Sequence, residues 1–343
     1  MFDVPRLTRR SAALAGALAL VAGAACSSDD EPQAGADSRP TDTTVAEGPF
    51  ASGRRTLTLV DPDRPTDAVP GKLPARADRT IEVEVVYPAE GDAGPDPTGE
   101  VAASGASTVD APPAPGAFPL VVFAHGFNGR GDVFLGLAER WAREGYVVAL
   151  PTFPLSRDGI GVSADLANQP GDVSFVIDEL AALDDADPLA GRVDVEHVAV
   201  GGHSLGAATV FGVAYNSCCL DERIDATIPV SGGTLAFEGG DYDDRPATPM
   251  LLVHGVQDET VPIAAGDAMF DLAEPPAWYL RPTGATHVTV FTGEPGRLLN
   301  EAAIAFLDAH LRDDDTALDA LAAMEDEVAA SGVGEWRVKP AGP

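Results

Sequence analysis

The spacing of hydrophobic and polar residues changes along the chain. Hydrophobic residues alternate with polar ones at residues 56–60 and 81–87, a period of two that indicates half-exposed antiparallel edge strands. Beyond residue 117 the apolar residues instead form short continuous runs, which are typical of strands buried on both faces. These runs cover residues 119–124, 146–150, 195–200, 225–230, 249–254 and 277–281.

Helical patterns separate these runs, and their alternation with buried strands predicts the α/β class. We expect a mostly parallel central sheet with helices on both faces. A Gly/Pro/Ala-rich stretch at 88–117 predicts a surface loop insertion, and 231–248 is too short to carry a cap domain. The site should therefore be open. The helical patterns lie near residues 132–144, 172–184, 205–215, 263–273 and 297–311, followed by an acidic one at 316–330.

The N-terminal residues predict an export signal followed by a tether. Arg6, Arg9 and Arg10 precede a short apolar stretch in residues 1–25, as in secretory signal peptides. The Arg9-Arg10 pair resembles a twin-arginine signal, and a Sec signal fits almost as well. Residues 26–52 are polar and predict a disordered tether. The folded domain is expected at 53–343, with 313–343 as a terminal helix and tail.

Cys26 is the predicted lipidation site. Small residues precede it and a polar run follows it, which resembles the lipobox of bacterial lipoproteins, although Gly23 stands where leucine is usual. Lipidation would make the protein a cell-surface lipoprotein held by an acyl anchor, its only association with a membrane. Simple cleavage after Ala24 would make it secreted.

The other two cysteines, Cys218 and Cys219, are adjacent. Their Cα atoms lie about 3.8 Å apart across a trans peptide, closer than in most disulfides. We expect a free, buried pair, with a vicinal bridge as the alternative. Two neighbouring cysteines alone do not make a zinc site.

The chain is strongly acidic. It has 22 basic and 54 acidic side chains, for a formal charge of −32. Such a surface repels nucleic acids and favours neutral or cationic substrates, and it also serves solubility. The acidic cluster Asp241, Asp243 and Asp244 lacks the spacing of a calcium loop and predicts a solvated turn. No metal and no cofactor is expected.

Ser204 is the candidate nucleophile. The segment Gly202–Gly206 reads Gly-His-Ser-Leu-Gly and lies between a buried run and a helical pattern. A glycine on either side of serine permits the sharp strand-to-helix turn of a nucleophile elbow, which exposes the serine oxygen above the sheet.

His287 and Asp258 are the expected base and acid. A serine needs a base to take its proton, and His287 lies in the loop after the last predicted strand. Asp258 follows the preceding strand, with Glu259 as its rival, and would orient the imidazole. The remaining histidines are expected to be structural: His125 and His254 shape loops, His203 packs under the elbow, and His197 and His310 are structural or solvated.

The oxyanion hole is expected from two backbone N–H groups, those of Phe127 and Leu205. Phe127 follows a buried strand and a His-Gly turn, and Leu205 begins the helix after the nucleophile. The longest loop over the site spans 151–169. Its apolar residues Phe153, Leu155, Ile160 and Val162 could contact an acyl group or simply pack within the loop.

These motifs, in this order, resemble the α/β-hydrolase superfamily across residues 54–312. The His-Gly-Phe, Gly-His-Ser-Leu-Gly and His-Gly-x-x-Asp segments are most similar to the lineage of platelet-activating-factor acetylhydrolases, chlorophyllases, dienelactone hydrolases and cutinase-like polyesterases. The resemblance implies the α/β-hydrolase fold and a serine esterase or lipase-like enzyme. It would act through an acyl-enzyme on a neutral ester, which could be small, lipid or polymeric. We expect a monomer. A peptidase, a thioesterase and a non-catalytic binding lipoprotein are the alternatives.

Overall fold

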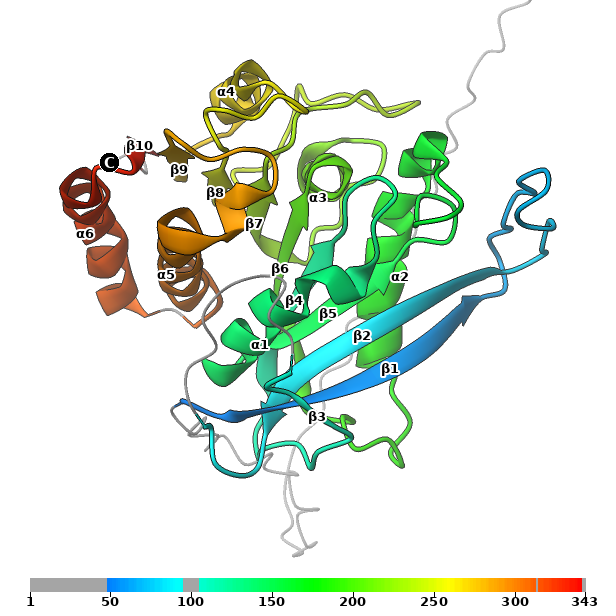
Figure 1. The fold of residues 1–343 in the computed structure, drawn as a ribbon. Coiled ribbons are helices and arrows are strands. Elements are labelled where there is room, and N and C mark those ends of the chain that lie inside the picture. The colour runs from blue at the N-terminus through cyan, green and yellow to red at the C-terminus, as the bar shows by residue number, and fades with distance from the viewer. Residues whose placement is uncertain (1–47, 95–104, 313, 341–343) are drawn as a thin grey trace, which may run out of the picture. The chain divides into compact units, whose positions relative to one another are not determined.

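One large sheet organises the part of the chain that the structure describes. The computed structural model describes residues 48–94, 105–312 and 314–340. The predicted signal, most of the tether and Cys26 lie outside these residues. The strand order is β10-β9-β8-β7-β6-β4-β5-β2-β1-β3, and the strands from β4 to β9 run parallel (Figure 1). The strands are β1 (Ala51–Asp61), β2 (Arg79–Ala89), β3 (Thr108–Val109), β4 (Phe118–Ala124), β5 (Val147–Thr152), β6 (Val193–His203), β7 (Ile224–Val230), β8 (Met250–Val253), β9 (Ala277–Pro282) and β10 (Gly334–Lys339).

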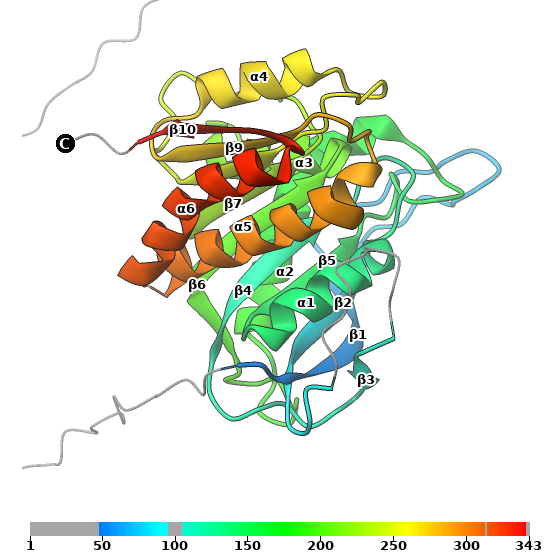
Figure 2. The same cartoon turned by 60° about the vertical axis from the view of Figure 1, so that its left-hand side comes forward.

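Helices cover both faces of the sheet, which confirms the predicted fold class. Helices α1, α5 and α6 pack on one face, and α2, α3 and α4 pack on the other (Figure 2). Within the described residues, no helix is long and apolar enough to cross a membrane. The helices are α1 (Leu135–Arg143), α2 (Gln169–Ala181), α3 (Leu205–Tyr215), α4 (Ile263–Leu272), α5 (Gly293–Leu311) and α6 (Asp315–Ser331), with 3₁₀ turns η1 (Gly131–Phe134), η2 (Ser163–Ala167) and η3 (Thr289–Phe291).

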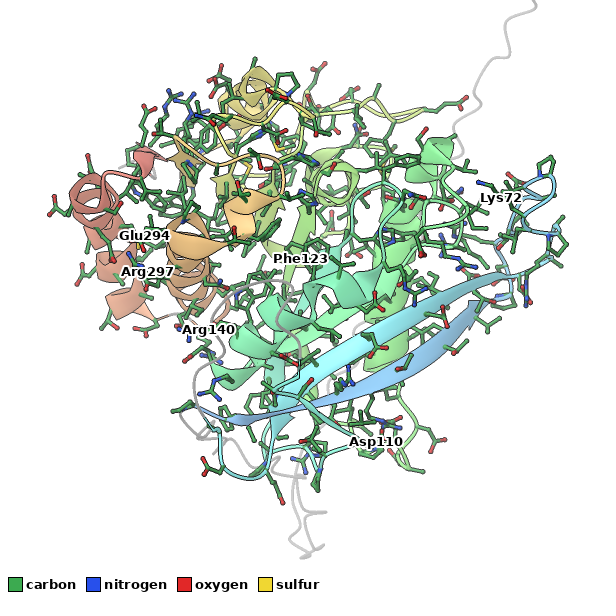
Figure 3. The ribbon with its side chains drawn as sticks, in the orientation of Figure 1. Lys72, Asp110, Phe123, Arg140, Glu294 and Arg297 are labelled. Carbon is green, nitrogen blue, oxygen red and sulfur yellow. A yellow bond between two sulfur atoms is a disulfide. The ribbon has the colours of Figure 1, made fainter. Side chains whose placement is uncertain are left out.

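The continuous apolar runs follow from this double cover. Along β4, Val121 and Phe123 join the core beneath α1 and α5, while Leu120 and Val122 join the core beneath α2 and α3. Phe123 packs among helices and strands at the centre of the molecule (Figure 3). Successive side chains of a strand point to opposite faces of the sheet, so alternate residues stabilise opposite layers. Burying one large apolar side chain contributes about 1.5–3 kcal/mol.

Two expectations about the sheet edges are wrong. β2 is not an edge strand, because it pairs with β1 on one side and with β5 on the other. The sheet ends at β3 on one side and at β10 on the other. β10 pairs antiparallel with β9, and no strand was predicted there. Its sequence, Gly-Glu-Trp-Arg-Val-Lys, is short and highly charged, so its pattern resembles that of a polar tail.

The predicted boundaries of the tether and the loop insertion also need correction. β1 begins at Ala51, and the side chain of Phe50 is buried edge-on against Phe118, with ring centroids 5.3 Å apart. The folded domain therefore starts before residue 53. Two parts of the predicted 88–117 insertion are strands: the end of β2 and the short β3, which pairs parallel with β1.

The prediction of a free, buried cysteine pair is wrong. Cys218 and Cys219 form a vicinal disulfide, with Cα atoms 3.8 Å apart. Cys218 is exposed and Cys219 is half-buried in the turn after α3. The side chain of Asn216 accepts a hydrogen bond from the Cys218 N–H, 3.1 Å away, which holds this turn.

A buried ion network joins β2 to α2 and to the loop after β5. The Arg79 guanidinium, 1% exposed, donates to Asp172 at 2.6 Å and to Asp165 at 2.9 Å. The other oxygen of Asp165 accepts the N–H of Leu155, 3.1 Å away. Arg79 thereby compensates two carboxylates that are hidden from water, and it holds the loop in place.

Replacing Arg79 with Met should strongly destabilise the protein, because buried Asp165 would lose its cation and buried Asp172 would keep only its pair with Arg64, 2.8 Å away. We expect the free energy of unfolding to fall by about 3–5 kcal/mol, as measured by urea denaturation. Arg76 is the control: its pair with Asp78 is exposed, so Arg76→Met should change stability little. Equal effects of the two substitutions would contradict this interpretation.

Candidate active site

Ser204 occupies a strained turn between β6 and α3. Its φ and ψ are 58° and −117°, a conformation that costs a non-glycine residue about 1–3 kcal/mol. The N–H of Ser204 donates to the Val230 carbonyl of β7, 2.9 Å away. A Cβ on Gly206 would lie 2.2 Å from the carbonyl oxygen of Ala124. The glycine thus lets α3 start directly against β4, as a nucleophile elbow requires.

Asp258 and His287 meet from two neighbouring loops. His287 Nδ1 lies 2.7 Å from Asp258 Oδ2, although 28 residues separate the two in sequence. Asp258 follows β8 and His287 follows β9, and these two strands pair in parallel. The Asp258 side chain is fully buried, and that of His287 is 14% exposed. The structure therefore brings together two of the three residues predicted to form a relay.

Hydrogen bonds from His287 and from backbone N–H groups keep Asp258 ionised. Oδ1 accepts the N–H groups of Thr260 at 2.9 Å and Val261 at 2.8 Å. Burial alone would raise the pKa of the carboxyl, but the hydrogen bonds from His287 and Val261 outweigh it and lower the pKa. Glu259, the rival residue, is exposed. The geometry therefore favours Asp258 as the partner of the imidazole.

His203 connects the elbow to the loop of His287. Its Nε2 lies 2.9 Å from the His287 carbonyl oxygen, and the two imidazole rings are 4.5 Å apart. Burial and the neighbouring His287 lower the pKa of His203 to about 4, so it is neutral at pH 7. The His203 ring packs against Phe134 and Phe291, with ring centroids 6.0 and 5.2 Å apart. Its bond to the His287 carbonyl tethers the His287 loop to the elbow. That tether has no signal in the sequence beyond adjacency to the serine.

The two predicted oxyanion donors lie on elements that touch. A Cβ on Gly126 would lie 3.0 Å from Ser204 Cβ, so the turn before Phe127 approaches the serine closely. In the described ranges, no protein acceptor takes the N–H of Phe127 or Leu205. Because neither N–H group has a protein acceptor, both could donate to a substrate oxygen. Asn128, which follows Phe127, has a φ of 58°.

The other histidines hold loops, as predicted for His125 and His254. His125 Nδ1 lies 2.7 Å from the Gly126 carbonyl oxygen, and its Nε2 accepts the N–H of Phe153 at 3.0 Å. His254 Nε2 donates to the Val261 carbonyl oxygen, 2.9 Å away, within the loop of Asp258. His197 is half-exposed and pairs with Asp194 at 2.8 Å.

Most apolar side chains of the loop over the site are buried. Phe153 is fully buried in the core beneath α2 and α3, and Leu155 and Ile160 are 4% and 8% exposed. Val162 is only half-buried. The acidic cluster after β7 forms a turn in which Asp241 accepts the N–H of Asp243 at 3.1 Å. Among the described residues, no group of acidic, histidine and cysteine side chains could hold a metal ion.

Acid should destabilise the fold through the buried His125. Burial lowers the pKa of His125 to about 4, below the ordinary value of about 6.5 in an unfolded chain. The unfolded state therefore binds the proton first, and stability that is complete above pH 6.5 is lost as the pH falls toward 4. The loss from this residue should be about 3 kcal/mol.

Urea denaturation at pH 7 and pH 4 checks this expectation. His125→Gln removes the titrating ring, so its unfolding free energy should fall less between the two pH values than that of the wild type. The same pH dependence in both proteins would refute the role of His125.

Comparisons with known proteins agree with this fold. The model of the chlorophyllase family matches residues 96–234. No curated protein matches the sequence. Among solved structures, a ferulic acid esterase from Streptomyces cinnamoneus is 22% identical, with a TM-score of 0.57, and the match covers 77% of this chain and 91% of that chain. The chain thus has the α/β-hydrolase fold and resembles the chlorophyllase-like lineage that its motifs predicted.

Proposed function

We propose that the protein is a serine carboxylic-ester hydrolase that works through an acyl-enzyme. The observation that carries this proposal is the strained Ser204 directly after β6, whose neighbour His203 lies 4.5 Å from the ring of a His287 already bonded to a buried Asp258. The resemblance to the chlorophyllase family supports an esterase-like hydrolase. The transfer of a proton between Ser204 and His287 remains a prediction.

In the first half-reaction, the oxygen of Ser204 attacks the ester carbonyl and its proton passes to His287 Nε2. The carbonyl π electrons move to the oxygen, which accepts the N–H groups of Phe127 and Leu205. Each such donor contributes about 2.7–4 kcal/mol to lowering the barrier. The intermediate then collapses, the alkoxide leaves, and the imidazolium protonates it to give an alcohol.

In the second half-reaction, water replaces the alcohol. His287 takes a proton from the water, whose oxygen attacks the acyl carbonyl and forms a second tetrahedral intermediate. Its collapse expels Ser204, which regains a proton from His287, and releases the carboxylic acid. Asp258 stays ionised throughout and stabilises the imidazolium in both steps.

A neutral ester with apolar groups suits the surroundings of the site. The side chain of Phe127, whose N–H is a proposed oxyanion donor, is 49% exposed. Val288, next to His287, is 62% exposed, and Val256, two residues before Asp258, is 36% exposed. The charge of −32 disfavours anionic substrates. Aromatic esters, suggested by the name of the ferulic acid esterase, belong to this class, as do lipid and polymeric esters.

We also propose export and an acyl anchor at Cys26, with the folded domain acting as a monomer. The support is the basic, apolar and small-residue order of the N-terminal sequence. Mass spectrometry of the N-terminal peptide of the protein expressed in its own host would test the anchor. An unmodified cysteine or a cleaved peptide lacking Cys26 would exclude it.

Removing the nucleophile or the acid should abolish most ester hydrolysis. Ser204→Ala should lower kcat for a p-nitrophenyl ester by about 10⁴-fold or more, and Asp258→Asn by about 10⁴-fold. Glu259→Gln is the matched control, one residue away and exposed, and should retain wild-type kcat. Equal losses in the Asp258 and Glu259 variants, or full activity of Ser204→Ala, would refute the assignments.

The bond cleaved should be an oxygen ester. We expect kcat/KM for p-nitrophenyl esters from acetyl to palmitoyl to exceed that for matched thioesters and peptide anilides. Preference for an anilide or a thioester would favour the alternative enzymes. A wild-type protein that a fluorophosphonate labels no faster than Ser204→Ala would instead favour the binding lipoprotein.

A further inference from the structure

Three buried polar side chains form a chain of hydrogen bonds beneath the proposed active site. Thr209 Oγ1 donates to Gln169 Oε1 at 2.5 Å, and Gln169 Nε2 donates to Ser156 Oγ at 2.8 Å. All three residues are fully buried. Thr209 belongs to α3, Gln169 begins α2, and Ser156 lies in the loop after β5. We call this set the Gln169 relay.

Each end of the Gln169 relay adjoins one proposed oxyanion donor. Thr209 lies one turn after Leu205 on α3, and its hydroxyl is 3.1 Å from the Leu205 carbonyl oxygen. At the other end, the carbonyl oxygen of Ser156 accepts the N–H of Asn128 at 2.7 Å. Asn128 directly follows Phe127. The relay therefore links the element that carries one donor to the loop that carries the other.

The loop that contains Ser156 is itself fixed to the frame. The Leu155 N–H is held by Asp165, which pairs with Arg79 of β2. Farther along, the ammonium of Lys72 donates to the Ile160 carbonyl oxygen at 2.7 Å. Lys72 extends from the loop between β1 and β2 (Figure 3). These contacts fix the position of Ser156, and the Ser156 carbonyl in turn fixes the position of Asn128.

Gln169 suits this place because a neutral amide presents an acceptor and a donor at once. Its oxygen takes the Thr209 proton while its nitrogen gives a proton to Ser156. A carboxylate cannot donate, and a thioether is a weak acceptor and no donor. Burying these polar groups is favourable only when each of them has a hydrogen-bond partner. Both bonds of the Gln169 amide must therefore form together, which fixes the distance between α3 and the Ser156 loop.

We propose that Gln169 is a positioning residue that sets the distance between the Phe127 and Leu205 N–H groups. This inference rests on the proposed function. Gln169 does not touch the substrate. It acts through Thr209 on the helix and through Ser156 on the Asn128 loop, so that both donors reach one developing oxyanion.

The test is Gln169→Met, which keeps the side-chain length and removes both hydrogen bonds. Removing a whole oxyanion donor costs about 10²–10³ in kcat, so a displaced donor should cost about ten- to a hundredfold. KM should change less than threefold. Affinity for a boronic acid that mimics the tetrahedral intermediate should fall by the same factor as kcat.

Tyr215→Phe is the matched control for loss of a buried hydrogen bond. Tyr215 is also on α3, and its hydroxyl donates to the Thr248 carbonyl oxygen at 2.8 Å, away from the relay. Its removal should lower Tm and leave kcat unchanged. If Gln169→Met likewise lowers Tm while kcat stays within twofold, the residue is merely structural and the inference is overturned.

A second pair of variants covers the case in which Gln169→Met does not fold. Thr209→Val removes the hydroxyl at nearly constant volume and should lower kcat and boronic acid affinity together. Thr209→Ser keeps the hydroxyl and should restore both, whereas equal kcat in the two variants would overturn the inference. A wild-type protein that cleaves no ester and resists fluorophosphonates would overturn the proposed function, and the inference with it.

Discussion

The hydrogen bond between Asp258 and His287 depends on how the parallel sheet ends. β8 and β9 run side by side, so the loops that follow them emerge at the same edge and bring a carboxylate to an imidazole at 2.7 Å. Burying the carboxylate is costly unless donors surround it. Thr260 and Val261 supply two backbone N–H groups, and the imidazole supplies the third bond. The position of the base thus follows from the architecture of the strands.

The same edge concentrates unusual backbone geometry. Ser204, Asn128 and Ser231 all have positive φ values without being glycine, and each lies after a strand at the carboxyl end of the sheet. Such conformations persist only where surrounding contacts determine them. Here those contacts include the Val230 carbonyl for Ser204, the Ser156 carbonyl for Asn128 and the Val253 carbonyl for Ser231. Rigid parallel strands hold the strained turns in place.

The interior strands and most helices could be predicted because a doubly covered sheet imposes a local apolar signal. β4 and α3 lie within a residue of their predicted bounds. Ser204, Asp258 and His287 could be nominated because each follows a buried run. The vicinal disulfide could not be predicted, because it depends on a turn supported by Asn216. β10 could not be predicted either, because it depends on pairing with β9, which is distant in sequence.

The roles of Gln169 and His203 were also invisible in the sequence. Gln169 ends the loop predicted at 151–169, where a polar residue is ordinary, and its burial arises only when α3 and the Ser156 loop close around it. His203 was expected to pack under the elbow, but its bond to the His287 carbonyl depends on a loop 84 residues away. Contacts of this kind come from tertiary structure and leave no local periodicity.

The most direct measurement is to map the covalent intermediate. Wild-type protein mixed with an activated ester, quenched in acid during turnover and digested, should give one acylated peptide, modified at Ser204. Asp258→Asn should accumulate that adduct far more slowly, because its imidazole loses the anion that orients it. An acyl group at another residue, or rapid turnover with no adduct under conditions in which deacylation limits the rate, would contradict the account.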